Sequence, residues 1–150
     1  MAGAWWEKIG ALGERVERAT ALPATGSLFT ISGGRVLMTS IVGELTAACD
    51  ANATASKLQA NPTTGTVRDL CTAVNIASYA IGDLIGISGV AADALLPPAT
   101  AGSIEGMTVP VVLQEGTLDL NVAAGGQVTG RVKWTMRYIA LDQGAQVVAA

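Results

Sequence analysis

Residues 131–139 of this 150-residue chain read Arg-Val-Lys-Trp-Thr-Met-Arg-Tyr-Ile. Polar and apolar side chains alternate along this run, so Trp134 and Met136 share one face of a strand and Lys133 and Arg137 share the other. The alternation predicts a half-buried strand in which Trp134 is a core anchor rather than a ligand platform. We expect the opposite face to be solvated, with an anion-binding face as the alternative; it carries Arg131, Lys133, Thr135 and Arg137.

A second run, residues 36–45, is nearly all apolar or small and fits a strand that is buried on both faces or at a subunit contact. Gly33-Gly34 just before it allows the positive φ of a tight hairpin. Similar runs recur from Ser27 onward, so we predict an all-β fold for residues 27–150: a β-sandwich, jelly-roll-like or small barrel domain. The predicted strands are Ser27–Ser32, Arg35–Leu45, Thr54–Ala60, Thr66–Ile76, Leu84–Val90, Thr108–Leu113, Thr117–Ala123, Val128–Ala140 and Gln146–Val148.

The first residues have a different period. Between residues 4 and 20, apolar side chains recur at spacings of three and four, which predicts a short N-terminal amphipathic helix. Gly10 and Gly13 each cost about 1 kcal/mol relative to Ala inside a helix, so the helix needs a surface to pack on. That surface belongs either to its own domain or to a neighbouring subunit or partner. We therefore divide the chain into a helical arm (1–22), a linker (23–26) and a single β domain (27–150).

Two segments are candidate partner-binding surfaces. In the segment around Pro97-Pro98, which has no strand period, Leu95 and Leu96 would be exposed on a long loop. We predict that these leucines dock on a neighbour, with folding back on the same chain as the alternative. The last six residues form either an edge strand or a tail that pairs with an adjacent chain. The arm contributes the candidates Trp5, Trp6, Ile9, Leu12 and Val16.

The composition excludes several classes of function. Only 14% of the residues are charged and the net charge is -3, a surface that favours a homo-oligomer or a component of a larger assembly. The 9 Lys and Arg residues are dispersed along an acidic chain, which argues against a nucleic-acid partner. The chain has no His, so Ser-His-Asp, Cys-His and His-rich metal sites are excluded.

Cysteines and targeting signals give further expectations. Cys49 and Cys71 are widely spaced, which predicts buried free thiols, or alternatively a cross-strand disulfide, and no metal site. Charged residues interrupt the N-terminal segment, so we expect no secretion signal. No apolar run approaches the roughly 18 residues of a membrane helix, so we expect a soluble protein without a membrane partner.

The sequence predicts no catalytic residue, no bound cofactor and no metal site. The calcium-loop pattern that starts at Asp50 fails, because Ala55 and Asn61 replace the required Gly and acid. Glycoside hydrolysis would need two carboxyl groups converging across a cleft, from among Asp69, Asp83, Asp93, Glu105 and Glu115. Sugar binding would need exposed aromatics, from among Phe29, Tyr79, Trp134 and Tyr138.

Several strings of residues resemble a known family. Residues 28–46 read Leu-Phe-Thr-Ile-Ser-Gly-Gly-Arg-Val-Leu-Met-Thr-Ser-Ile-Val-Gly-Glu-Leu-Thr, and residues 57–65 read Lys-Leu-Gln-Ala-Asn-Pro-Thr-Thr-Gly. Together with residues 87–95 and 106–113, these strings resemble small proteins encoded among the virion genes of tailed bacteriophages and prophages. The likeness covers roughly residues 27–145 and leaves out the N-terminal segment.

The resemblance implies a non-enzymatic structural protein of the phage particle, namely a capsid decoration or cement protein on the head exterior. Its implied partners are the major capsid protein and further copies of itself, with a trimer favoured. It would be made in the bacterial cytoplasm and would bridge neighbouring shell subunits on the virion surface. The alternative is a head-fibre or tail component that binds a host-surface glycan or receptor, and a third option is a structural tail or connector protein.

Overall fold

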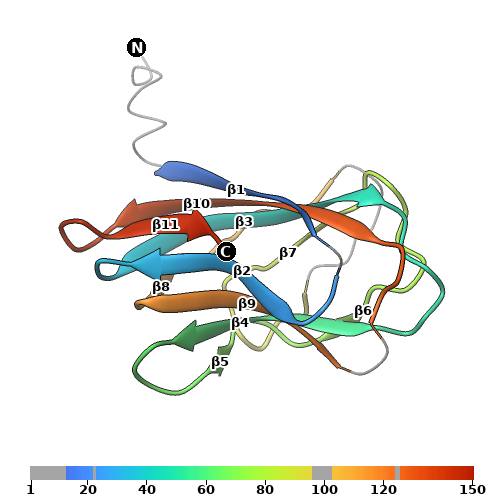
Figure 1. Ribbon diagram of the computed structural model, residues 1–150, viewed down its shortest axis with the longest axis horizontal. Coiled ribbons are helices and arrows are strands. Elements are labelled where there is room, and N and C mark those ends of the chain that lie inside the picture. The colour runs from blue at the N-terminus through green and yellow to red at the C-terminus, as the bar shows by residue number, and fades with distance from the viewer. Residues whose placement is uncertain (1–12, 22, 96–102, 124–125) are drawn as a thin grey trace, which may run out of the picture.

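Two antiparallel sheets face each other in the computed structural model, which describes residues 13–21, 23–95, 103–123 and 126–150 (Figure 1). The first sheet has the strand order β1-β10-β3-β7, and β8 also pairs with β3. The second has the order β11-β2-β9-β4-β5, and β6 also pairs with β4. Over the described residues, the predicted all-β, sandwich-like fold is therefore confirmed.

The long predicted strands are confirmed to within a few residues, whereas those predicted over 66–76, 84–90 and 108–113 are much shorter. The segment 66–76 retains only β5 and β6, two residues each. The bounds are β1 Glu14–Ala21, β2 Gly26–Ser32, β3 Val36–Ala47, β4 Ala55–Pro62, β5 Arg68–Asp69, β6 Val74–Asn75, β7 Leu84–Gly86, β8 Val111–Leu113, β9 Gly116–Ala123, β10 Arg131–Ala140 and β11 Gln146–Ala149.

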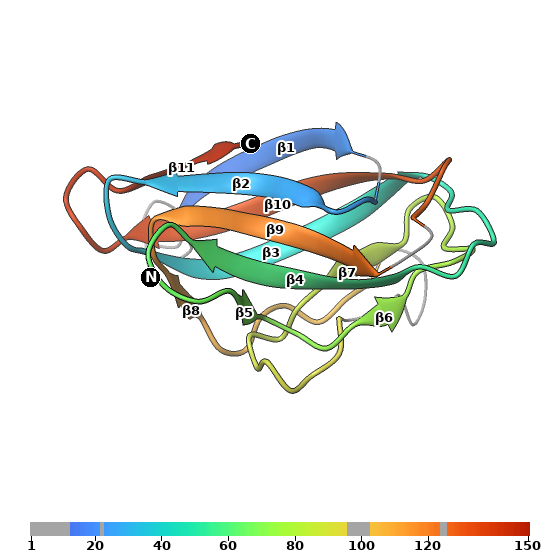
Figure 2. The same cartoon turned by 60° about the horizontal axis from the view of Figure 1, so that its bottom comes forward.

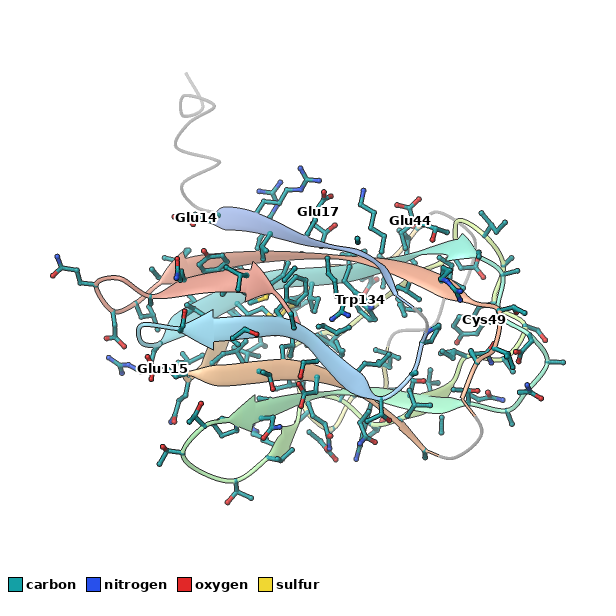
Figure 3. The ribbon with its side chains drawn as sticks, viewed as in Figure 1. Glu14, Glu17, Glu44, Cys49, Glu115 and Trp134 are labelled. Carbon is teal, nitrogen blue, oxygen red and sulfur yellow. The ribbon has the colours of Figure 1, made fainter. Side chains whose placement is uncertain are left out.

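The core lies between the sheets and follows the predicted alternation. Burial along β10 alternates residue by residue, and Trp134 is only 1% exposed, which confirms it as a core anchor (Figure 3). From the other sheet, Phe29, Leu58 and Leu118 are fully buried against it. β3 is central in its sheet, because it pairs with β10 on one side and with β7 and β8 on the other.

The predicted helix over residues 4–20 is wrong for residues 14–20, which belong to β1; residues 4–12 of that prediction lie outside the described residues. β1 pairs with β10 from Glu14, opposite Tyr138, to Ala21, opposite Val132. The physical reason is that β10 offers an unpaired row of backbone hydrogen-bonding groups, whereas the glycines of this segment weaken a helix. The first strand of the β domain therefore begins within the segment assigned to a helical arm.

The two margins of the sandwich differ. At one margin β1 lies against β11, so the first and last strands of the chain are neighbours across the two sheets. β11 pairs with β2 through residues 146–149, so the C-terminal residues form the edge strand rather than the tail of the two predicted alternatives. At the other margin the edges are the short strands β7 and β8 of the first sheet and β5 and β6 of the second, and β5, β6 and β8 lie on the same side in Figure 2. We call this second side the open margin.

Candidate interaction surfaces

Most of the predicted partner-binding residues lie outside the described residues, namely Trp5, Trp6, Ile9, Leu12 and Leu96. The other two pack into their own chain. Val16 on β1 is half-buried and packs against the core cluster. Leu95 is 0% exposed. For Leu95 the structure therefore shows the alternative in which this segment folds back on its own chain, and docking on a neighbour stays a prediction for Leu96.

Leu95 is held in place by backbone pairing as well as by burial. Its N–H donates to the Thr72 carbonyl over 2.9 Å, and the Thr72 N–H donates to the Asp93 carbonyl over 2.8 Å. Thr72 and Ala94 thereby form a parallel bridge. A leucine held at this point covers the core at the open margin, which the short strands β5 and β6 leave incompletely covered.

Four of the eight large apolar side chains that are exposed among the described residues lie at or next to the open margin. Val109 and Val112 are 45% and 54% exposed, on β8 or just before it, and Val90 is 41% exposed. The Val109 N–H donates to the Ser88 carbonyl over 3.1 Å, which places Val109 beside the segment that carries Val90. Val67, 46% exposed, precedes β5 at the same margin. We name Val67, Val90, Val109 and Val112 the open-margin patch.

A small hollow of about 170 Å³ lies next to this patch, between the end of β4, β5 and β8. Ile31 and Leu113 contribute apolar walls, while Asn61 and Arg68 contribute polar groups. Ligand pockets for small molecules are usually about 300–1,000 Å³ and enclose most of the ligand. This hollow is therefore better suited to receive one side chain of a partner than a whole ligand.

Three of the five carboxylates named in the sequence analysis, those of Asp69, Asp83 and Asp93, are engaged in local structure. Asp69 accepts hydrogen bonds from Lys57 (2.8 Å) and Gln59 (2.6 Å), and these partners hold its pKa below the usual range. Asp93 accepts one from the Ser88 hydroxyl over 2.6 Å, and Asp83 accepts one from the Ala80 N–H over 2.8 Å. These bonds fix turns, and no described acid among them faces a base or nucleophile in a cleft.

Asp142 makes the most extensive ion pair of the described residues. Its carboxylate accepts hydrogen bonds from the Arg35 backbone N–H (2.7 Å), Nε (2.9 Å) and Nη2 (2.8 Å). The Arg35 guanidinium lowers the pKa of Asp142 well below its ordinary value. The pair ties the β2–β3 hairpin to the β10–β11 hairpin, so its role is structural.

A buried polar cluster that the sequence analysis missed joins residues 50–54 to residues 127–128. Gln127 is 3% exposed; its Oε1 accepts the Asp50 N–H over 2.6 Å, and its Nε2 donates to the Asn52 carbonyl over 2.9 Å and to the Thr54 hydroxyl over 3.1 Å. The Asp50 carboxylate accepts the N–H groups of Val128 and Asn52, which lowers its pKa. The pattern that suggested a calcium loop is thus a hydrogen-bonded turn.

Both cysteines are buried free thiols, as the first of the two predicted alternatives states. Burial raises the pKa of both Cys49 and Cys71, so each thiol stays protonated near neutral pH. The Cys71 sulfur accepts the Leu58 N–H over 3.3 Å. Over the described residues, no group of three or more His, Cys, Asp or Glu side chains is placed to hold a metal ion.

The outward face of β1 and β10 carries charged side chains. Lys133 lies 3.3 Å from the Glu17 carboxylate, which also pairs with Arg15, and these bases lower the pKa of Glu17. Arg15 and Arg137 are opposite each other across the two strands. Both line a shallow hollow of about 550 Å³ at the start of β1, together with Gly13 and Ile139. Glu14 and Glu17 on β1 are labelled in Figure 3.

The described aromatic side chains are committed to the core. Phe29, Trp134 and Tyr138 are 0%, 1% and 4% exposed, and Tyr79 is half-buried against the core cluster. The Tyr138 hydroxyl donates to the Glu14 carboxylate over 2.9 Å. A flat aromatic platform for stacking on a sugar is therefore absent from the part of the chain that the structure describes.

Comparisons with known proteins add no relative: no family model, no curated protein and no solved structure matches this chain. A search of the described residues for a helix long and apolar enough to cross a membrane found none.

Proposed function

We propose that this chain is a non-enzymatic structural protein of a tailed-phage particle, a decoration or cement protein that binds the head exterior and bridges neighbouring shell subunits. The observation that carries the proposal is the open-margin patch: apolar side chains stand exposed on short edge strands and loops instead of lining a ligand cavity. Exposed apolar groups that cluster at a sheet edge are typical of a surface that another protein covers. The resemblance of residues 28–46 and 57–65 to virion proteins supports the same role.

The proposed stabilisation of the shell relies on the burial of apolar surface. When the open-margin patch meets a shell subunit, apolar area leaves water at roughly 25 cal/mol per Å². Contacts made by one copy with two shell subunits would stabilise the shell, because binding favours the assembled state over the dissociated one. Self-association into an oligomer, with a trimer favoured, would multiply these contacts. Trp5 and Trp6 in the N-terminal segment remain our candidates for a further shell contact.

The test is co-sedimentation of the purified chain with shells that lack it. Val109→Asp and Val112→Asp should weaken shell binding by about tenfold or more, because each buries an unpaired carboxylate in the contact. Val148→Asp is the matched control: Val148 is 47% exposed, but it lies on β11 at the opposite margin. Equal binding by all three variants would overturn the patch as the contact surface.

A truncation separates the N-terminal segment from the body. Deletion of residues 1–12 removes Trp5 and Trp6 and leaves β1 intact, since β1 begins at Glu14. We expect the truncated protein to remain folded and to bind shells more weakly. Unchanged shell binding would remove the N-terminal segment from the proposal. Failure of the full chain to bind shells, combined with binding to host-surface glycans, would favour the head-fibre or tail alternative.

A further inference from the structure

Charge is unevenly distributed along the sequence. Between Arg68 and Arg131 there is no Lys or Arg, so all 9 basic residues lie outside this stretch. The same stretch forms β6 to β9 and the open margin. Its acidic residues are Asp69, Asp83, Asp93, Glu105, Glu115 and Asp119. Every charged side chain of this stretch is therefore acidic, although Lys57 of β4 pairs with Asp69 and Arg68 lies beside it in β5. By contrast, β1 and β10 carry Arg15, Lys133 and Arg137 on their outward face.

Arg15 and Arg137 form a like-charge pair. They are register partners across β1 and β10, and both line the 550 Å³ hollow. Like charges directly opposite on one face of a sheet are destabilising. Arg15 is relieved by its ion pair with Glu17, whereas the half-buried Arg137 has a guanidinium with no hydrogen bond or ion pair to another described residue; its backbone carbonyl accepts the Thr39 hydroxyl. Glu14 lines the same hollow, but its carboxylate accepts the Tyr138 hydroxyl. A further carboxylate beside the Arg137 guanidinium would therefore stabilise this arrangement.

Two acids of this stretch are available for such a contact. Glu105 and Glu115 are exposed, and neither carboxylate accepts a hydrogen bond from another described residue; the only such bond to Glu115 is to its backbone carbonyl, from the Thr63 N–H. By contrast, Asp69, Asp83 and Asp93 are engaged in the turns described above. Glu115 lies at the β8–β9 turn, well apart from Glu17 on the outward face of β1 (Figure 3). Glu115 is thus not part of the outward β1–β10 face.

We propose that the outward β1–β10 face binds a second copy of this chain, with the Glu105 and Glu115 carboxylates of that copy supplying the negative charge at Arg15 and Arg137. Charge complementarity between two surfaces of the same chain favours a second copy over an unrelated partner. Because the two surfaces differ, the contact is head-to-tail and closes a ring when the rotation between copies allows it. The inference is independent of the decoration role, since purified protein alone tests it.

The test is sedimentation equilibrium of the full chain over a concentration and salt series. Arg137→Glu should weaken self-association by about tenfold or more, and added salt should weaken the wild type. Arg68→Glu is the matched control: it makes the same change in net charge, but Arg68 lies on the acidic side in β5, so self-association should not weaken. Circular dichroism checks that each variant is folded.

A charge exchange completes the test. The double variant Glu105→Arg, Glu115→Arg should also lose self-association, and mixing it with Arg137→Glu should restore a mixed oligomer. A wild type that is monomeric up to about 1 mM would overturn the proposal. So would equal weakening by Arg137→Glu and Arg68→Glu, or a mixture that stays monomeric. None of these outcomes depends on shell binding, which is measured separately.

Discussion

Replacing Leu95 with Ala distinguishes a core leucine from a docking leucine. Leu95 is 0% exposed and its N–H is bonded to the Thr72 carbonyl, so the substitution removes buried methyl groups while the backbone stays paired. Leu→Ala changes in well-packed cores cost about 2–5 kcal/mol. At about 3 kcal/mol, a chain of this size should lose about 6–12 °C in Tm. Since domains are stable by only about 5–15 kcal/mol, the effect is large.

The assay is urea unfolding followed by tryptophan fluorescence, at a protein concentration low enough to keep the chain monomeric. Val112→Ala is the control; its side chain is 54% exposed, so the free energy of unfolding should change by less than about 0.5 kcal/mol. If Leu95→Ala leaves the stability of the monomer unchanged and weakens oligomer or shell binding, Leu95 is not a core residue. That result would return Leu95 to a docking role.

Three further predictions concern single contacts. The pKa of Asp142 is lowered in the folded state, so its pairing with Arg35 stabilises the fold above about pH 4 and loses this effect as the pH falls further; Asp142→Asn should therefore flatten the acid side of a Tm-against-pH curve, and a curve parallel to the wild type would count against it. Cys49 and Cys71 should react with a thiol reagent at neutral pH only after denaturant is added, and rapid labelling of the native protein would contradict their burial. Gln127→Ala should destabilise the fold by about 2 kcal/mol, measured by urea unfolding, because it leaves the Asp50 N–H without its acceptor; an unchanged midpoint would show that water replaces the amide.

The strands that sequence alone predicted well are those with one buried and one exposed face. In β10, Val132, Trp134 and Met136 alternate without interruption with polar residues, because one face of the strand is buried along its length and the other is not. The sequence did not predict β1. This strand lies at a margin of the sandwich, where side chains that point toward the other sheet also reach polar groups. Glu14 accepts the Tyr138 hydroxyl, and Arg18 donates to the Ser27 carbonyl. Charged side chains on the inward face hid the two-residue period.

The candidate surfaces were less predictable, for a different reason. The sequence places Leu95 on an exposed loop, because Pro97-Pro98 indicates irregular structure. It does not reveal that the backbone of Thr72 pairs with Asp93 and Leu95. The exposure of Val109 and Val112 likewise depends on β8 being an edge strand, which is a property of strand order. The absence of bases between Arg68 and Arg131 was visible in the sequence, but the opposed position of Arg15 and Arg137 requires the register.

The pairing of β1 with β10 has a consequence for synthesis. Glu14 and its partner Tyr138 are separated by 124 residues, so β1 cannot find its place until nearly the whole chain has left the ribosome. At translation rates of about 5–20 residues per second, that interval is roughly 6–25 seconds. During this interval β10 has not yet been synthesised, so β3 lacks its longest neighbour and β1, which follows the N-terminal tryptophans, has no strand to pair with. The nascent chain therefore exposes apolar surface and unpaired strand edges that the folded protein covers.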